Sequence, residues 1–214
     1  MRQCDLRFAM KNIQLSLFEQ LSRVEPTLSD EGVVRRLCED LLDDADVRPP
    51  VNVKLLASLR GIARVEARMQ PWDGVLAREK DRFVVGVRAS DGVERQRFTV
   101  LHEAGHTLLP GFAEARQYRC EGPKTRDEQL CDIAAAELLL PRRFFVSDLL
   151  EADPGLDGVE ALAAGYEASI EATALRAVDL DADPAMLLVF RLAHKPSEHC
   201  LLYTSPSPRD RQKS

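Results

Sequence analysis

The sequence predicts an α+β fold in which a small antiparallel sheet precedes a helix-rich second half. β-forming residues gather in short runs within residues 62–87, separated by charged or glycine-containing turns. On both sides of this segment, apolar residues recur at the spacing of amphipathic helices. The chain has 214 residues, 45% of them hydrophobic, so it is long enough for one domain with a real core.

Two helices are expected before the sheet. The first spans about residues 29–45, after a Ser-Asp start signal, and its apolar face carries Val33, Val34, Leu37, Leu41 and Leu42. Pro49 and Pro50 break the chain, and a short second helix then runs from Val53 to near Gly61. The expected strands are residues 64–66, 74–77 and 83–87.

A longer helix should follow the sheet. Asp91 and Glu94 resemble a capping box, and the helix should run from there to a stop at Pro110-Gly111. Further helices are expected at about residues 127–140, 159–164 and 170–178, and a strand at residues 185–192.

Composition excludes several classes of protein. The net charge of -6 gives no broad basic surface, which argues against nucleic acid as a direct partner. The first residues lack the apolar core of a signal peptide, and no stretch approaches the roughly 18 apolar residues of a membrane span. Five scattered cysteines without CxxC pairing indicate reduced thiols. These features predict a soluble, cytoplasmic protein with no membrane partner.

The end of the chain is expected to be artificial. Residues 200–210, CLLYTSPSPRD, can be encoded by a transposase adapter used in preparing sequencing libraries. We therefore expect residues 200–214 to be a non-native tail that packs against nothing. The alternative is a natural Ser/Pro-rich tail that is disordered by composition.

The segment His102-Glu103-Ala104-Gly105-His106 has the pattern of a metal site. Four residues of α-helix turn the side chain by about 400°, so the two imidazoles lie on one face and can share a tetrahedral metal. Glu103 is turned by about 100° from His102, where it can reach a metal-bound water without being a ligand. The pattern predicts a zinc metallopeptidase with Glu103 as general base. The alternative is two surface histidines on an ordinary helix.

A catalytic zinc needs a third protein ligand, which the downstream sequence must supply. Glu128 is favoured because it begins an apolar helix, and because Asp132 follows four residues later on the same face. Asp132 could accept the remaining N–H of a ligand histidine. Cys120 is the main alternative to Glu128 as third ligand. The alternative interpretation of Glu128 is a solvated charge in the first turn of a helix. The full set of candidates is Glu114, Cys120, Glu121, Asp127, Glu128 and Asp132.

Residues 45–145 resemble the ImmA/IrrE-type metallopeptidases. The resemblance is carried by RQRFTVLHEAGH at residues 95–106, EQLCD at residues 128–132 and AAELLLP at residues 135–141. It implies that Glu128 is the third zinc ligand, and it implies a compact zincin fold. The chain departs from the family at three positions: Cys131 replaces the usual alanine, Asp132 a common asparagine, and Ala134 a frequent aromatic residue.

The expected elements, the resemblance and the suspected tail together suggest an organisation of the chain, and the resemblance implies a role. The expected parts are an N-terminal helical segment (1–48), a zincin catalytic domain (49–145), a helical extension (146–180), the start of a truncated C-terminal region (181–199) and the non-native tail (200–214). The implied role is the cleavage of a helix-turn-helix transcriptional repressor in response to stress or to mobile-element signals.

The expected mechanism is hydrolysis of a peptide bond. With zinc held by His102, His106 and Glu128, Glu103 would take a proton from the attacking water and pass it to the leaving amine. The donor that stabilises the oxyanion stays open among Tyr118, Arg119 and His194, each of which could equally be a solvated side chain. Two alternatives remain: a metal-dependent protein that binds a repressor without cleaving it, and a purely structural metal site, which would usually have four protein ligands.

Overall fold

The computed structural model describes residues 16–79, 82–112, 117–118 and 125–180, and it confirms the α+β class. The helices in these ranges are α1 (Leu17–Val24), α2 (Asp30–Asp44), α3 (Val53–Leu59), α4 (Val93–His106), α5 (Arg126–Leu139), α6 (Arg142–Glu151), α7 (Leu156–Tyr166) and α8 (Ile170–Asp179). The strands are β1 (Ile62–Arg68), β2 (Gly74–Glu79), β3 (Arg82–Arg88) and β4 (Gln117–Tyr118). None of the described helices is both long and apolar enough to cross a bilayer.

The sheet is mixed, which differs from the all-antiparallel sheet expected. Its strand order is β1-β3-β2-β4, and β1 pairs with β3 in parallel, whereas β2 is antiparallel to both β3 and β4. The link after Arg68 passes the end of β3, where Arg68 pairs with Arg88, and β2 begins on the far side of β3 at Gly74. The β2–β3 hairpin thus places β3 in the middle of the sheet.

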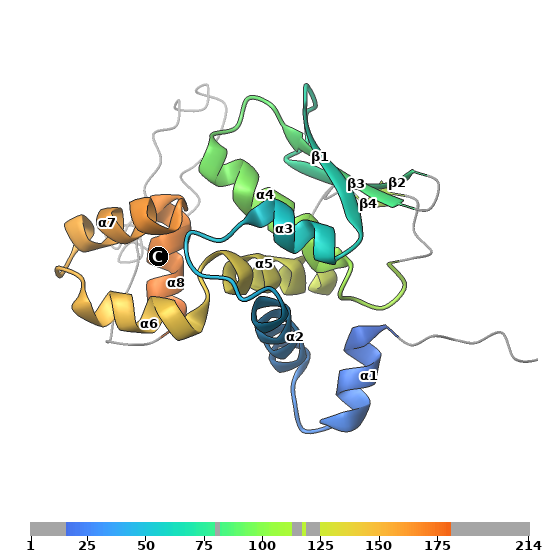
Figure 1. Cartoon of the computed structure of the whole chain (residues 1–214), viewed down its shortest axis with the longest axis horizontal. Coiled ribbons are helices and arrows are strands. Elements are labelled where there is room, and N and C mark those ends of the chain that lie inside the picture. The colour runs from blue at the N-terminus through green and yellow to red at the C-terminus, as the bar shows by residue number, and fades with distance from the viewer. Residues whose placement is uncertain (1–15, 80–81, 113–116, 119–124, 181–214) are drawn as a thin grey trace, which may run out of the picture.

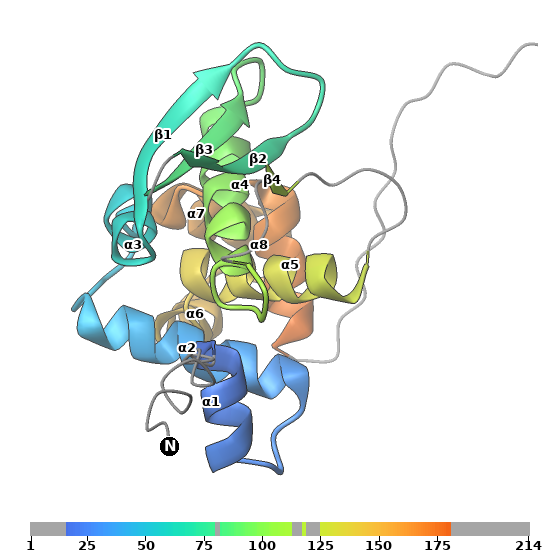
Figure 2. The same ribbon diagram turned by 90° about the vertical axis from the view of Figure 1, so that its right-hand side faces the viewer.

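The helices stack in layers beneath the sheet. Figure 1 and Figure 2 show α4 against the sheet, α5 beneath α4, and α2 beneath α5. One hydrophobic cluster runs through these layers and continues into α6 and α7 through Phe145, Leu162 and Tyr166. The metal-binding pattern of α4 therefore lies between two layers that hold it from both sides.

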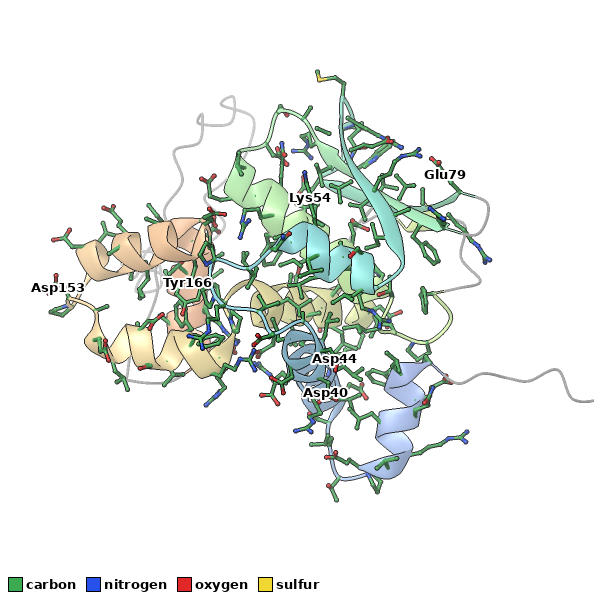
Figure 3. All side chains as sticks on the ribbon, in the orientation of Figure 1. Asp40, Asp44, Lys54, Glu79, Asp153 and Tyr166 are labelled. Carbon is green, nitrogen blue, oxygen red and sulfur yellow. The ribbon has the colours of Figure 1, made fainter. Side chains whose placement is uncertain are left out.

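The expected amphipathic face of α2 is confirmed. Val33, Val34, Leu37, Leu41 and Leu42 are all buried, and the helix begins after Ser29, whose hydroxyl accepts a hydrogen bond from the Gly32 N–H. Figure 3 shows the exposed side chains of Asp40 and Asp44 on the side of α2 away from the sheet. Burial of the apolar face on α5 is what fixes the helix, because exposed charges add little.

Helix α4 begins and ends differently from the expectation. The capping box at Asp91 is wrong: Gly92 is the N-cap residue, and no side chain caps the helix. Asp91 instead lies 3.5 Å from the Arg88 guanidinium, and its carbonyl accepts a hydrogen bond from Gln96. The helix ends at His106, before the expected stop at Pro110, and residues 107–109 continue as tighter turns with i to i+3 hydrogen bonds.

Two described helices were not expected from the sequence. Helix α1 begins at a capping box between Ser16 and Glu19, and α6 follows Pro141, where the preceding helix was expected to stop. Proline has no backbone N–H, and at a helix start this N–H would have no partner within the helix. Pro141 can therefore end one helix and begin the next. The expected strand at residues 185–192 and the tail at residues 200–214 lie outside the described residues.

A buried ion pair attaches α8 to α5. Arg176 on α8 and Glu137 on α5 are only 2% and 4% exposed. The two guanidinium NH groups of Arg176 donate to the Glu137 carboxylate, and its Nε donates to the Leu140 carbonyl at 3.1 Å. Buried charges are tolerated only when paired in this way. The pairing holds α8 beside α5, and residues of α8 line the same cleft as Asp132 of α5.

Candidate metal centre

The two histidines of α4 lie side by side near its C-terminal end. Their ring centroids are 5.4 Å apart, with the rings nearly perpendicular. His106 is 4% exposed, and the His102 side chain is 13% exposed, so both imidazoles are largely withdrawn from water. Neither histidine therefore fits the alternative of an ordinary surface residue.

Helix α5 brings two carboxylates to these histidines. Glu128 Oε2 lies 3.0 Å from His102 Nε2, and Glu128 Oε1 lies 3.6 Å from His106 Nε2. Asp132 Oδ1 lies 3.0 Å from His102 Nδ1, on the other side of the same ring. Thr125 precedes α5, and its hydroxyl accepts a hydrogen bond from the Glu128 N–H, which anchors the first turn that carries this glutamate.

The distances suit a shared metal ion. Two ligands at about 2.0–2.1 Å from one tetrahedral zinc are roughly 3.3 Å apart, close to both of the nitrogen–oxygen distances to Glu128. Two imidazole nitrogens and one carboxylate form a donor set found in catalytic zinc sites. His102, His106 and Glu128 could therefore hold zinc without a large rearrangement.

Glu103 lies in a buried position beside these ligands. It is 5% exposed, and its Oε2 is buried without a hydrogen-bond partner in the part of the chain that the structure describes. The Leu76 backbone N–H of β2 donates to this carboxylate. A buried carboxylate oxygen without a partner costs free energy unless a ligand or water satisfies it, and the carboxylate is close enough to His102 and Glu128 for their charges to shift its pKa.

Gly74 allows Glu103 to lie against the sheet. A Cβ added to Gly74 would overlap the Glu103 carboxylate and would lie 2.5 Å from Thr99 Cγ2. Only a residue without a side chain fits at this close approach. The sequence offered no signal for this role, because the contact joins residues 29 positions apart, between the first residue of β2 and the last turn of α4.

The protonation of the site follows from burial and neighbouring charge. Burial lowers the pKa of His102, but hydrogen bonds to Asp132 and Glu128 outweigh it and raise the pKa to about 9. Burial and the nearby His102 lower the pKa of His106. Burial also raises the pKa of Glu103 to about 8, with the negative charge of Glu128 acting in the same direction. A bound cation would favour neutral histidines and an ionised Glu103.

A cleft of about 620 Å³ opens beside Glu103 and His102. Its lining includes Trp72 before β2 and Gly74 at the start of β2, together with Ala172 and Leu175 of α8. The floor combines residues of α4 and α5, namely Phe98, Thr99, His102, Glu103, Asp132, Ile133 and Ala136. The cleft reaches the carboxylate expected to act as base, whereas His106 and Glu128 do not line it.

The other residues considered from the sequence are not brought to this centre by any described contact. Asp127 is exposed at the start of α5. Glu114, Cys120, Glu121, Arg119 and His194 lie outside the described residues, as does the side chain of Tyr118. No donor for the oxyanion is therefore assigned.

Cys131 is a member of the cluster that sequence reasoning did not single out. Its sulfur and one ring nitrogen of each of His102 and His106 all lie within 4.8 Å of one another. Burial, followed by the charge of Glu128, raises the pKa of this thiol. The available signal was its position three residues after Glu128, because that spacing places both side chains on one side of a helix.

The comparison with known protein families assigns the chain to a family. The pattern of the IrrE N-terminal-like domain, which defines a family of peptidases, matches residues 57–178. The chain belongs to this family. The match covers the sheet, both helices that carry the candidate site, and α8. It also confirms the ImmA/IrrE-type resemblance of the sequence, and it implies a metal-dependent peptidase.

Two curated relatives are radiation response metalloproteases called IrrE. The chain is 31% identical over 101 residues to the one from Deinococcus radiodurans, which covers 44% of this chain and 30% of the relative. It is 27% identical over 149 residues to the one from Deinococcus deserti, which covers 67% of this chain and 52% of the relative. The chain thus spans about half of the relatives' length or less.

Metal affinity should depend on pH because of His102. A histidine must be neutral to bind a metal, and with a pKa of about 9 His102 is protonated at neutral pH in the metal-free protein. Zinc binding should therefore release a proton, and zinc affinity should rise about tenfold per pH unit between about pH 6 and pH 8.

A competition titration with a chromophoric zinc chelator across this range measures the effect. As a control, Asp132→Asn removes one of the hydrogen bonds that raise the pKa of His102, so its pH dependence should level off at lower pH. An affinity that is constant above about pH 6.5, where an unperturbed histidine is already neutral, would contradict the assignment.

Proposed function

We propose that the protein is a zinc-dependent endopeptidase in which Glu103 is the general base. The observation that carries this proposal is the convergence of His102, His106 and Glu128 next to Glu103, whose buried Oε2 has no hydrogen-bond partner among the residues that the structure describes. A pure binding protein would not require a buried carboxylate at this point, because burying it without a partner is costly. The peptidase family of the chain supports the same reaction class.

In this proposal His102, His106 and Glu128 are the three protein ligands of the metal. Asp132 fixes the orientation of His102, because it accepts the Nδ1 proton and leaves Nε2 toward Glu128. Bound zinc would lower the pKa of a coordinated water and polarise the scissile carbonyl. The ligand set leaves a fourth position open to solvent or substrate, as catalytic sites require.

Glu103 performs the proton transfers. Its Oε2 takes a proton from the attacking water and delivers it to the nitrogen of the departing amine, so that the peptide C–N bond breaks. The Leu76 N–H holds the other part of the carboxylate in place, and Gly74 leaves room for it. Burial raises the pKa of Glu103 to about 8. A pKa near neutral pH suits a group that must first accept a proton and then donate it.

The proposed substrate is a protein, with a helix-turn-helix transcriptional repressor as the specific class. The cleft of about 620 Å³ has room for several residues of an extended peptide next to Glu103. The relatives are called radiation response proteases, which supports a regulatory role in stress. The repressor itself is proposed from the family resemblance alone.

Replacing Glu103 tests the reaction. Glu103→Gln keeps the shape of the side chain but cannot accept the proton, so peptide hydrolysis should fall by at least about 100-fold while the bound zinc is retained. Metal analysis and cleavage of a candidate repressor by gel or mass spectrometry measure both properties on the same sample. A zinc-loaded variant that still cleaves at the native rate would exclude Glu103 as the base, and a native protein without activity would favour the binding alternative.

The two acids of α5 should differ in their effect on the metal. Glu128→Ala removes a proposed ligand and should weaken zinc binding strongly, by more than the loss expected for Asp132→Ala. Asp132→Ala removes only the partner of His102, so affinity or activity should fall by about 10- to 100-fold. The matched control is Glu39→Ala, which removes an exposed glutamate on α2, away from the candidate site. Equal, small losses for Glu128 and Asp132 would contradict their assigned roles.

Gly74→Ala tests the position of Glu103 separately from its chemistry. The added methyl group must displace the carboxylate, and a misplacement of about 1 Å can cost about 100-fold in rate. Zinc binding should remain, because the three atoms nearest to the added Cβ belong to Glu103 and Thr99 and to none of the proposed ligands. Gly165→Ala is the control, since a Cβ there meets nothing within 4 Å. Native activity of Gly74→Ala would show that this close approach is not required.

A further inference from the structure

Cys131 lies on the side of α5 that faces the histidines. It follows Glu128 by three residues, and a turn of about 300° leaves the two side chains only about 60° apart around the helix. The residue is 0% exposed. Its sulfur is close enough to both imidazoles that the three potential ligand atoms lie within 4.8 Å of one another.

Gly105 brings the backbone of Cys131 to this position. A Cβ on Gly105 would lie 3.2 Å from Cys131 Cα and 3.1 Å from the Ala134 Cβ, so α4 and α5 approach closely at this point. Gly105 is the residue before His106, and the approach therefore places the Cys131 side chain level with the metal-binding turn. Cys38, the other buried cysteine in the described ranges, instead has its sulfur 3.9 Å from the Ala134 carbonyl oxygen.

We propose that Cys131 is a further, displaceable protein ligand of the metal bound by His102, His106 and Glu128. The inference rests on the metal site proposed above. Ligand atoms at about 2.1 Å and 2.3 Å from a tetrahedral zinc are roughly 3.4–3.6 Å apart. Since the limit on the present distances is 4.8 Å, a movement of about 1 Å brings the sulfur into coordination.

Coordination by Cys131 changes the state of the site. The S–H bond is replaced by a sulfur–metal bond, and the proton leaves to solvent or buffer. Two histidines, Glu128 and Cys131 then complete a tetrahedron, as in structural zinc sites. Water or a substrate carbonyl must displace the thiolate or expand the coordination, so Cys131 restrains hydrolysis in the resting protein. A thiolate also favours zinc, cobalt or cadmium over magnesium or manganese.

Cobalt spectroscopy of the full chain tests the inference. Cobalt(II) replaces zinc in such sites, and a coordinated thiolate gives an intense charge-transfer band in the near ultraviolet. The native protein with one equivalent of cobalt should show this band. Cys131→Ala should lose it but retain the weaker visible bands of a site with nitrogen and oxygen ligands. Cys131→Ser keeps the size of the side chain and should lose the band as well.

Controls separate this result from a folding defect and from another thiol. Circular dichroism and thermal unfolding of the metal-free variants check that they fold, and alanine is the usual residue at this position in the resembling family. Cys120→Ala should keep the band. A zinc-loaded Cys131→Ala variant should also cleave peptide at least as fast as the native protein, because the open position is no longer contested.

The inference is overturned if native protein binds cobalt without the charge-transfer band, or if the band persists in both Cys131 variants. In either case the proposed peptidase site, tested by Glu103→Gln and Glu128→Ala, still stands. A native protein that binds no cobalt or zinc at all overturns both the inference and the proposed function.

Discussion

The close contact between α4 and α5 is the constraint on which the candidate site depends. The two helices meet at Gly105, where any side chain would press on Cys131 and Ala134. That contact fixes how far His102 and His106 lie from Glu128 and Asp132, which come from a separate segment of the chain. Metal ligands must be placed to within a few tenths of an ångström, and buried helix packing supplies such precision where a loop would not.

Burial gives the site its electrostatic character as well as its geometry. Four ionisable side chains, His102, His106, Glu103 and Glu128, share one poorly solvated region. Burial lowers the pKa of both histidines, but hydrogen bonds to Asp132 and Glu128 outweigh it at His102 and raise its pKa, whereas the charge of His102 adds to the lowering at His106. Such a difference between the pKa values of neighbouring groups is typical of functional sites, since a purely structural core would avoid burying ionisable side chains together. A cation bound among them would stabilise the two buried carboxylates and would favour neutral histidines.

The parts of the site that could be predicted are those that depend on helical spacing. His102, Glu103 and His106 lie within one turn, and Glu128 and Asp132 are also one turn apart, so periodicity alone places each set on one face. Other parts depend on contacts between distant segments. Gly74 and the Leu76 N–H meet Glu103 only because β2 crosses α4.

The same distinction holds for the fold. The apolar face of α2 follows from the sequence, whereas the parallel pairing of β1 with β3 depends on the route of the chain after Arg68. The start of α4 was misplaced because Asp91, a good capping residue, lies near Arg88 of the preceding strand instead. The capping preference of Asp91 was overridden there by a contact with a residue only three positions earlier.

The ion pair between Arg176 and Glu137 has a consequence for how the cleft can vary among related proteins. A guanidinium and a carboxylate that share two hydrogen bonds tolerate little sliding or rotation, so this pair sets the separation of α8 from α5 and with it the width of the cleft. Two apolar residues in the same place could stabilise the packing of α8 on α5 as strongly. Such a contact is not directional, so it would allow several relative positions of the two helices. The charged pair therefore fixes the spacing of the two helices. A related protein with an apolar contact in its place could change the width of the cleft without any change in the residues of the candidate metal site.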